Sequence, residues 1–230
     1  MRRIIAAAAL LFLVVGLIAP VVRGSVAYDT FSTNFGYETQ AGSNITGASS
    51  APGYTDTANK FISQASGPVS DIWVPVARVS GVNAFDVQLM SDNGNSPGAV
   101  LQSWTITDQA FPFDGVYHNP IHLTVAGGTV LQQGTPYWLN LHATSDDGHL
   151  VWMFTRPPRF ETVAQRFAPG GAWNVLNPGF TSAYRVDVVP EPASAAMGLV
   201  LTVLAGRRVR REKNSPSPLP SPSSRERESD

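Results

Sequence analysis

The four histidines are the residues whose type and spacing come nearest to a metal site, and all lie between positions 118 and 149. His118 and His122 have the spacing of the two histidines in a zinc-binding helix. The glutamate of that motif is missing, however, and Pro120 is incompatible with the helix. His142 and His149 fall on neighbouring predicted strands without an evident third ligand. We therefore expect strand and surface histidines and no metal centre.

Two acidic loops are better suited to bind a cation. Asp92, Asn93 and Asn95 lie in one loop, and Asp146 and Asp147 lie in the other. Their oxygens are of the kind that Ca²⁺ prefers, but neither loop has the regularly spaced ligands and terminal glutamate of an EF-hand. Asp and Asn also form tight turns, so turn formation is the favoured interpretation and calcium binding the alternative.

Five tryptophans raise the possibility of sugar stacking, because an exposed aromatic ring can pack against a pyranose. Trp138, Asn140 and His142 alternate along one predicted strand and would share one face of it. That face mixes aromatic and polar groups, as a carbohydrate platform does. The competing interpretation is that Trp138 belongs to a hydrophobic core.

Catalytic groups are not apparent. Asp86 and Glu161 are isolated carboxylates, and no pair can be assigned to the two roles of a glycosidase. The Gly-x-Ser-x-Gly match at Gly94 to Gly98 lies in a predicted turn and not before a helix, so no nucleophile elbow is expected. We expect a non-enzymatic protein, with a secreted polysaccharide hydrolase or lyase as the least favoured alternative.

The composition restricts the partners. Residues 28–188 carry 12 acidic and 6 basic residues, a formal net charge of −6. An acidic surface argues against nucleic acid and anionic lipid as partners, because both require basic patches. The chain has no cysteine, so disulfides and cysteine-based zinc sites are excluded and a hydrophobic core must supply the stability.

The central region predicts an all-β domain. Apolar and polar residues alternate in several short segments, and turn residues separate these segments. The apolar rows are Phe85, Val87 and Leu89; Ile121, Leu123 and Val125; Tyr137, Leu139, Leu141 and Ala143; Leu150, Trp152 and Phe154; and Tyr184, Val186 and Val188. No sustained helical periodicity occurs between residues 28 and 188. The pattern favours a single β-sandwich of jelly-roll type.

The most specific local prediction is a hairpin closed by residues 145–148. It pairs Leu141 with Trp152 and Leu139 with Phe154, and it buries Trp152 almost completely. Trp138 would then lie on the opposite, mixed face. Trp138→Ala is accordingly expected to destabilise the domain less than Trp152→Ala.

The N-terminus predicts a secretory signal peptide over residues 1–27. Arg2 and Arg3 precede an apolar stretch and then small residues, which is the order of charged, apolar and cleavage regions in such a leader. Signal peptidase would cut before Tyr28 as the first choice and before Ser25 as the second. The alternative is an uncleaved membrane anchor.

The C-terminal segment 189–211 has three parts in sequence. Val189-Pro190-Glu191-Pro192 is followed by an apolar run, and a basic cluster then closes the segment. This order resembles the PEP-CTERM sorting signal of Gram-negative bacteria that make extracellular polysaccharide. The resemblance implies recognition of Pro-Glu-Pro by a membrane-embedded exosortase. The basic cluster comprises Arg207, Arg208, Arg210 and Arg211.

The apolar run from Ala193 to Gly206 is short for a transmembrane helix. It would span about 21 Å, against a hydrocarbon core of about 30 Å. The basic residues at both ends of the chain are expected on the cytoplasmic side, which places residues 28–188 outside. Family members normally stop near the basic cluster, whereas here residues 212–230 form a Ser/Pro-rich segment that predicts a disordered tail.

The central region resembles the choice-of-anchor R domain. The resemblance rests on Ser96-Pro97-Gly98, Gly134-Thr135-Pro136-Tyr137-Trp138-Leu139 and the strand Phe85 to Leu89. It implies a β-sandwich ectodomain and transfers no catalytic residue. The sequence as a whole predicts an exported protein that is held transiently at the inner membrane and then found at the cell surface or outside the cell. The expected role is structural or adhesive, with a carbohydrate-binding module attached to exopolysaccharide as the alternative.

Overall fold

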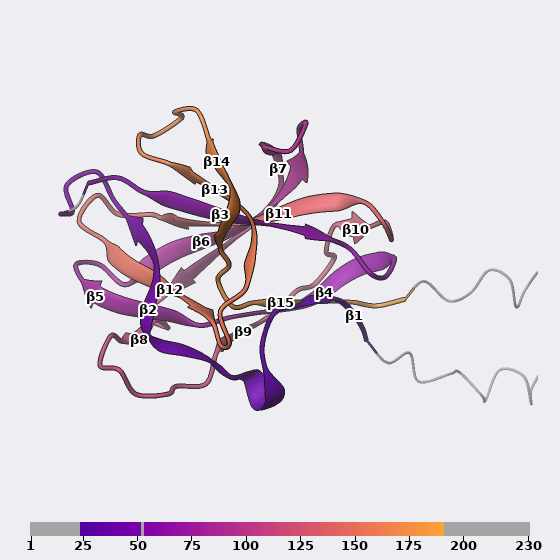
Figure 1. Ribbon diagram of the computed structural model, residues 1–230, viewed down its shortest axis with the longest axis horizontal. Helices are drawn as coiled ribbons and strands as arrows, with labels where there is room; N and C mark the ends of the chain where they lie inside the picture. Colours follow the sequence, from indigo (N-terminus) through magenta and orange to yellow (C-terminus); the bar gives the residue numbers. More distant parts are fainter. Residues whose placement is uncertain (1–23, 52, 191–230) are drawn as a thin grey trace, which may run out of the picture. The chain divides into compact units, whose positions relative to one another are not determined.

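The computed structural model describes residues 24–51 and 53–190, and this part of the chain is all-β, as the sequence predicts (Figure 1). A single 3₁₀ turn, η1 (Thr33–Phe35), is its only helical element. No helix long and apolar enough to cross a membrane occurs among these residues. Most of the predicted leader, and the sorting segment from Glu191 onward with its arginines and the tail, lie outside the described residues.

The largest sheet has six strands and carries most of the predicted apolar rows. In order across the sheet they are β14 (Asn174–Phe180), β13 (Phe160–Arg166), β3 (Asp56–Ile62), β11 (Pro136–Ala143), β6 (Ala84–Asp92) and β7 (Pro97–Thr107). The predicted turn at 92–98 joins β6 to β7, and Asn93 N–H donates to the Ser96 carbonyl at 2.8 Å. Gly94 and Asn95 both have positive φ, as the turn requires.

A second sheet brings the two ends of the described chain together. Its strands are β1 (Ser25–Asp29), β15 (Arg185–Val188), β4 (Gly67–Val74) and β10 (Val130–Leu131), with β9 (Ile121–Thr124) also paired to β4. β1 and β15 run antiparallel, and Ser25 is the register partner of Val188 (Figure 1). β1 therefore begins three residues before the predicted domain boundary at Tyr28.

The third sheet has four strands and completes the fold. In order they are β2 (Tyr37–Thr46), β12 (His149–Thr155), β5 (Val76–Ser80) and β8 (Phe111–Pro112). The apolar rows of all three sheets meet in one buried cluster that includes Leu139, Leu141 and Trp152. For the six-stranded sheet we call this side the inner face, and we call the opposite side the outer face.

The predicted β-hairpin is wrong in its pairing although its apolar rows are buried. β11 pairs with β3 and β6, whereas β12 pairs with β2 and β5 in a different sheet. The 145–148 connection therefore carries the chain across the core, and Leu141 and Trp152 approach it from two sheets. Alternation identifies the inward side of a strand, but it does not identify the neighbour that completes the hydrogen-bond ladder.

Glycines make room for this crossing. A Cβ atom at Gly47 would lie only 2.1 Å from the Ser145 carbonyl oxygen, and one at Gly81 would lie 1.9 Å from that of Asp147. Gly81 also has a φ of +71°, which side chains other than glycine rarely adopt. The connection is thus held by the backbones of two other strand ends.

Candidate functional site

The turn between β1 and β2 is the most unusual backbone segment of the described chain. Asn34 and Phe35 have φ values of 57° and 56°, and a bulky side chain in this left-handed region is an outlier. The Ser32 N–H donates to the Gly36 carbonyl at 3.1 Å and closes the turn. Each such residue costs on the order of 1–3 kcal/mol, and conformations of this kind concentrate at ligand sites.

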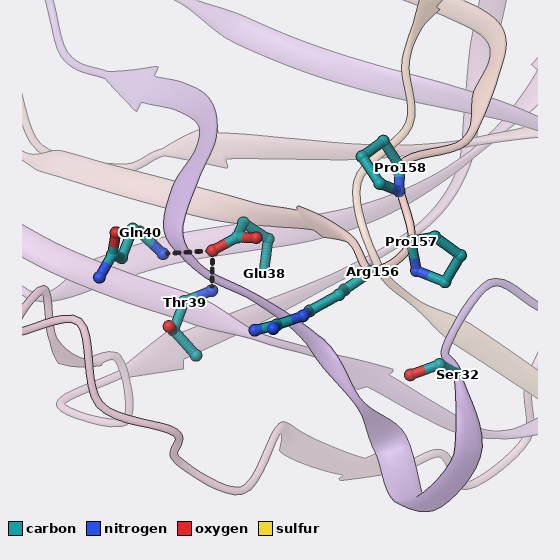
Figure 2. A pocket seen from close by; sticks show the side chains of 7 residues that line it. All are labelled: Ser32, Glu38, Thr39, Gln40, Arg156, Pro157 and Pro158. Atoms are coloured by element: carbon teal, nitrogen blue, oxygen red, sulfur yellow. Dashed lines mark hydrogen bonds between the residues drawn. The ribbon is translucent and has the colours of Figure 1, made fainter.

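A groove of about 780 Å³ lies on one side of this turn (Figure 2). Glu38, Thr39 and Gln40 at the start of β2 form one wall, and Arg156-Pro157-Pro158 after β12 form the other. Ser32 completes the lining. Figure 2 shows the Arg156 side chain extended across the groove toward β2.

The two charged side chains of the groove, Glu38 and Arg156, both line the open space. Glu38 Oε1 accepts the backbone N–H groups of Thr39 at 2.9 Å and Gln40 at 3.2 Å, which fixes the carboxylate (Figure 2). The arginine ion pairs within the described residues belong to Arg166 and Arg185, so the Arg156 guanidinium is available to a ligand. A fixed acceptor and a free planar donor thus face the same space.

A second hollow of about 260 Å³ lies on the other side of Ser32. Asp29 and Arg185 form its charged wall, with 3.6 Å between Oδ2 and Nη1. Burial raises the pKa of Asp29 above its ordinary value, although the Phe31 N–H and Arg185 act in the opposite direction. Phe35 supplies an aromatic wall, and its ring centroid lies 5.8 Å from the Arg185 guanidinium. Ser32 lines both hollows, and we call the two together the turn groove.

Stacked side chains support the second hollow from below. Trp73 on β4 lies between the Arg185 guanidinium, at 5.2 Å, and the His122 ring, at 4.5 Å and almost parallel. His122 Nε2 in turn lies 2.8 Å from Asp71 Oδ1. Both faces of the indole are therefore occupied, so Trp73 holds Arg185 in position and does not itself offer a stacking surface.

The predicted sugar platform is corrected by the structure. Trp138, Asn140 and His142 do share the outer face of the six-stranded sheet, but Trp138 and Asn140 are fully buried and only His142 reaches solvent. The reason is that Trp173 and Val175, from β14 and the segment before it, cover this face. The Trp138 Nε1–H donates to Asp92 Oδ1 at 2.7 Å, so the indole is a core residue.

A buried ion cluster lies beside these residues. Asp56 on β3 is fully buried and accepts from Arg166 Nε at 2.7 Å and from the Tyr54 hydroxyl at 2.8 Å. His142 Nδ1 lies 2.9 Å from the other carboxylate oxygen. The hydrogen bond to Asp56 raises the pKa of His142 above its ordinary value, against the opposing effect of burial. Every oxygen of Asp56 is thus engaged, which is the arrangement of a structural cluster.

Among residues 24–51 and 53–190, no three His, Asp or Glu side chains converge on a common point. Asp92 is bonded to Lys60 at 2.9 Å, and Asp147 accepts the Ser145 hydroxyl at 2.6 Å. Asp92 Oδ2 also accepts the Asn95 N–H at 3.1 Å, a contact within the turn. His118 pairs with Asp114 and does not join His122.

No motif or spacing in the sequence predicts the turn groove. Its charged residues Asp29, Glu38, Arg156 and Arg185 are spread over most of the domain, and only the strand pairing brings them together. No protein-family model, curated protein or solved structure matches this chain.

Proposed function

We propose that the protein is an exported β-sandwich of jelly-roll type that an exosortase sorts to the cell surface or the polysaccharide matrix, where its role is structural or adhesive. The observation that carries this proposal is the pairing of Ser25 with Val188. The predicted leader runs into β1 and the predicted sorting motif begins at Val189, so both membrane-directed segments would join the domain at one end of one sheet. If both terminal segments are held at the membrane, the domain can still fold, because its first and last strands are neighbours in one sheet.

The sorting motif also follows the fold without a linker. Val189 comes directly after β15, and its N–H donates to the Pro68 carbonyl at 2.9 Å. Pro190 cannot continue such a ladder because it has no N–H. The Pro-Glu-Pro motif therefore starts where strand pairing ends.

Loss of exosortase is expected to change the C-terminus and the location of the protein. In cells that have the enzyme, the C-terminal peptide should end within the sorting segment, and the domain should appear at the surface or in the medium. In cells without it, the chain should keep Arg207–Arg211 and remain with the inner membrane. Fractionation with peptide mass spectrometry measures both. A cytoplasmic domain, or a C-terminus that is the same in both strains, contradicts the proposal.

The turn groove favours a second candidate function, carbohydrate binding. The carboxylate of Glu38 and the guanidinium of Arg156 can accept from and donate to sugar hydroxyls, and Pro157 and Pro158 offer apolar ring surface. The adjoining hollow adds Phe35. These residues take the place of the predicted platform at Trp138.

Arg156→Ala is expected to weaken glycan binding about 10-fold or more, because a hydrogen bond to a charged group is worth about 1.5–3 kcal/mol. The measurement is a glycan array of neutral and uronate polysaccharides, followed by titration of each hit. Arg78→Ala is the matched control, since Arg78 is an exposed arginine on β5, outside the turn groove. Equal binding by the Arg156 variant and the wild type, or no hit on the array, rules this candidate out.

A further inference from the structure

Strand β1 starts at Ser25, three residues before the predicted boundary at Tyr28. Ser25, Val26, Tyr28 and Asp29 each have a register partner on β15, with a bulge at Ala27. A chain cut before Tyr28 would lose more than half of β1. Because β1 is the edge strand beside β15, its loss would expose the backbone of β15 to solvent and to other chains.

The predicted cut before Tyr28 would also remove Ala27, and the loss of this residue would destabilise the fold. Ala27 is fully buried and belongs to the main hydrophobic cluster. Its carbonyl accepts the Gln64 N–H at 2.7 Å. A cut after Ala27 would delete this acceptor, open a cavity, and place a new ammonium group on Tyr28, whose ring packs against Phe61 and Tyr184. Charged groups are costly at such a position.

Gly24, in contrast, lies outside the strand. It is exposed, and a Cβ atom built on it would have its nearest neighbours at 3.7 and 4.0 Å, which is ordinary contact distance. In the sequence, Val22 and Gly24 occupy the third and first positions before Ser25, where signal peptidase reads small residues. A cut here leaves every residue of β1 in place.

We propose that the leader is removed at the Gly24–Ser25 bond, so that Ser25 is the N-terminus of the exported protein. A water molecule adds across this amide; the C–N bond breaks, and Gly24 ends as a carboxylate and Ser25 as an ammonium. The inference rests on the proposed export. The cut precedes docking of β1, because its partner strand lies more than 150 positions later in the chain and must be exported first.

The test is the mass of the N-terminal peptide from the full chain expressed in an exporting Gram-negative host. Peptides are read after denaturation, so the result does not depend on folding. We expect Ser25 as the major terminus. Tyr28 as the major terminus, or a retained leader, overturns the proposal.

Variants at the cut give an independent readout. Gly24→Leu should abolish the Ser25 terminus and leave a longer precursor, because the residue before the cut must be small. Gly24→Ala is the matched control and should keep the Ser25 terminus. If Gly24→Leu is cut as efficiently and at the same bond as the wild type, the proposal is wrong.

The same samples separate this inference from the sorting proposal when both strains are compared. A Ser25 terminus in both strains, with a C-terminus that does not depend on exosortase, leaves this inference standing and removes the sorting proposal. A Tyr28 terminus with exosortase-dependent C-terminal processing overturns this inference and leaves the sorting proposal standing.

Discussion

Replacing Trp152 with alanine is expected to lower the free energy of unfolding by about 3–5 kcal/mol. The side chain is fully buried in the cluster shared by the three sheets, and its ring centroid lies 5.6 Å from that of Tyr184. Its Nε1–H donates to the Ala183 carbonyl at 2.8 Å, so truncation also removes a buried hydrogen bond. A domain of this size is typically stable by about 5–15 kcal/mol, so the loss is a large fraction of the total.

Urea and thermal unfolding of the full chain measure this effect, and two further variants interpret it. Trp138→Ala should cost a similar amount, contrary to the sequence expectation, because Trp138 is equally buried and is bonded to Asp92. Phe160→Ala should cost less than about 1 kcal/mol, since that ring is 56% exposed. If Trp138→Ala behaves like Phe160→Ala, the outer face of the six-stranded sheet is not covered as described.

Asp56→Ala is expected to destabilise the protein by about 3–5 kcal/mol, because removing one member of a buried ion pair leaves its partners uncompensated. Arg166 would lose contacts of 2.6 and 2.7 Å, and Tyr54 and His142 would lose their acceptor. Asp86→Ala is the matched control. Asp86 also faces His142 across the sheet but is only half-buried and bonds to Thr105, so its removal should cost less than about 1 kcal/mol.

The pH dependence distinguishes this cluster from a general packing effect. The folded-state pKa of His142 is raised, so the stability it contributes is fully present below its unfolded pKa of about 6.5 and is lost as the pH rises through the folded-state value. Asp56→Ala should return the pKa of His142 toward its ordinary value. Titration of the His142 ring by NMR measures this pKa directly. A residue-specific method is needed because burial lowers the pKa of His149, which also contributes to the pH dependence of stability. An unchanged His142 titration in the Asp56 variant contradicts the cluster.

The strands could be predicted from the sequence because each leaves a local pattern. Phe85, Val87 and Leu89 alternate with polar residues, and the turn at 92–98 contains the Asn and Gly that positive φ values require. The partner of each strand could not be predicted. Residues 145–148 look like a hairpin turn because a tight reversal and a crossing between sheets use the same residue types.

The candidate site was beyond prediction for a related reason. Trp138 was placed on the correct face, but its burial depends on Trp173 and Val175, which lie more than 30 positions later in the sequence, on β14 and just before it. The turn groove depends on positive φ values at Asn34 and Phe35; asparagine adopts this region readily, but the residue type of Phe35 gives no sign of it. Arg156 becomes a candidate binding residue only because it faces Glu38 across the groove, and Glu38 is more than a hundred positions away in the sequence.

The position of β15 has a mechanical consequence. β15 is hydrogen-bonded on both sides, to β1 and to β4, and the chain leaves it at Val188 along the strand direction. Inter-strand hydrogen bonds in antiparallel sheets lie perpendicular to the strands. A pull on the chain beyond Val188 therefore loads both ladders in shear, and their bonds must yield together instead of opening one after another. If the proposed C-terminal anchor holds the domain, drag on the domain would pass through β15 and would be opposed by both ladders.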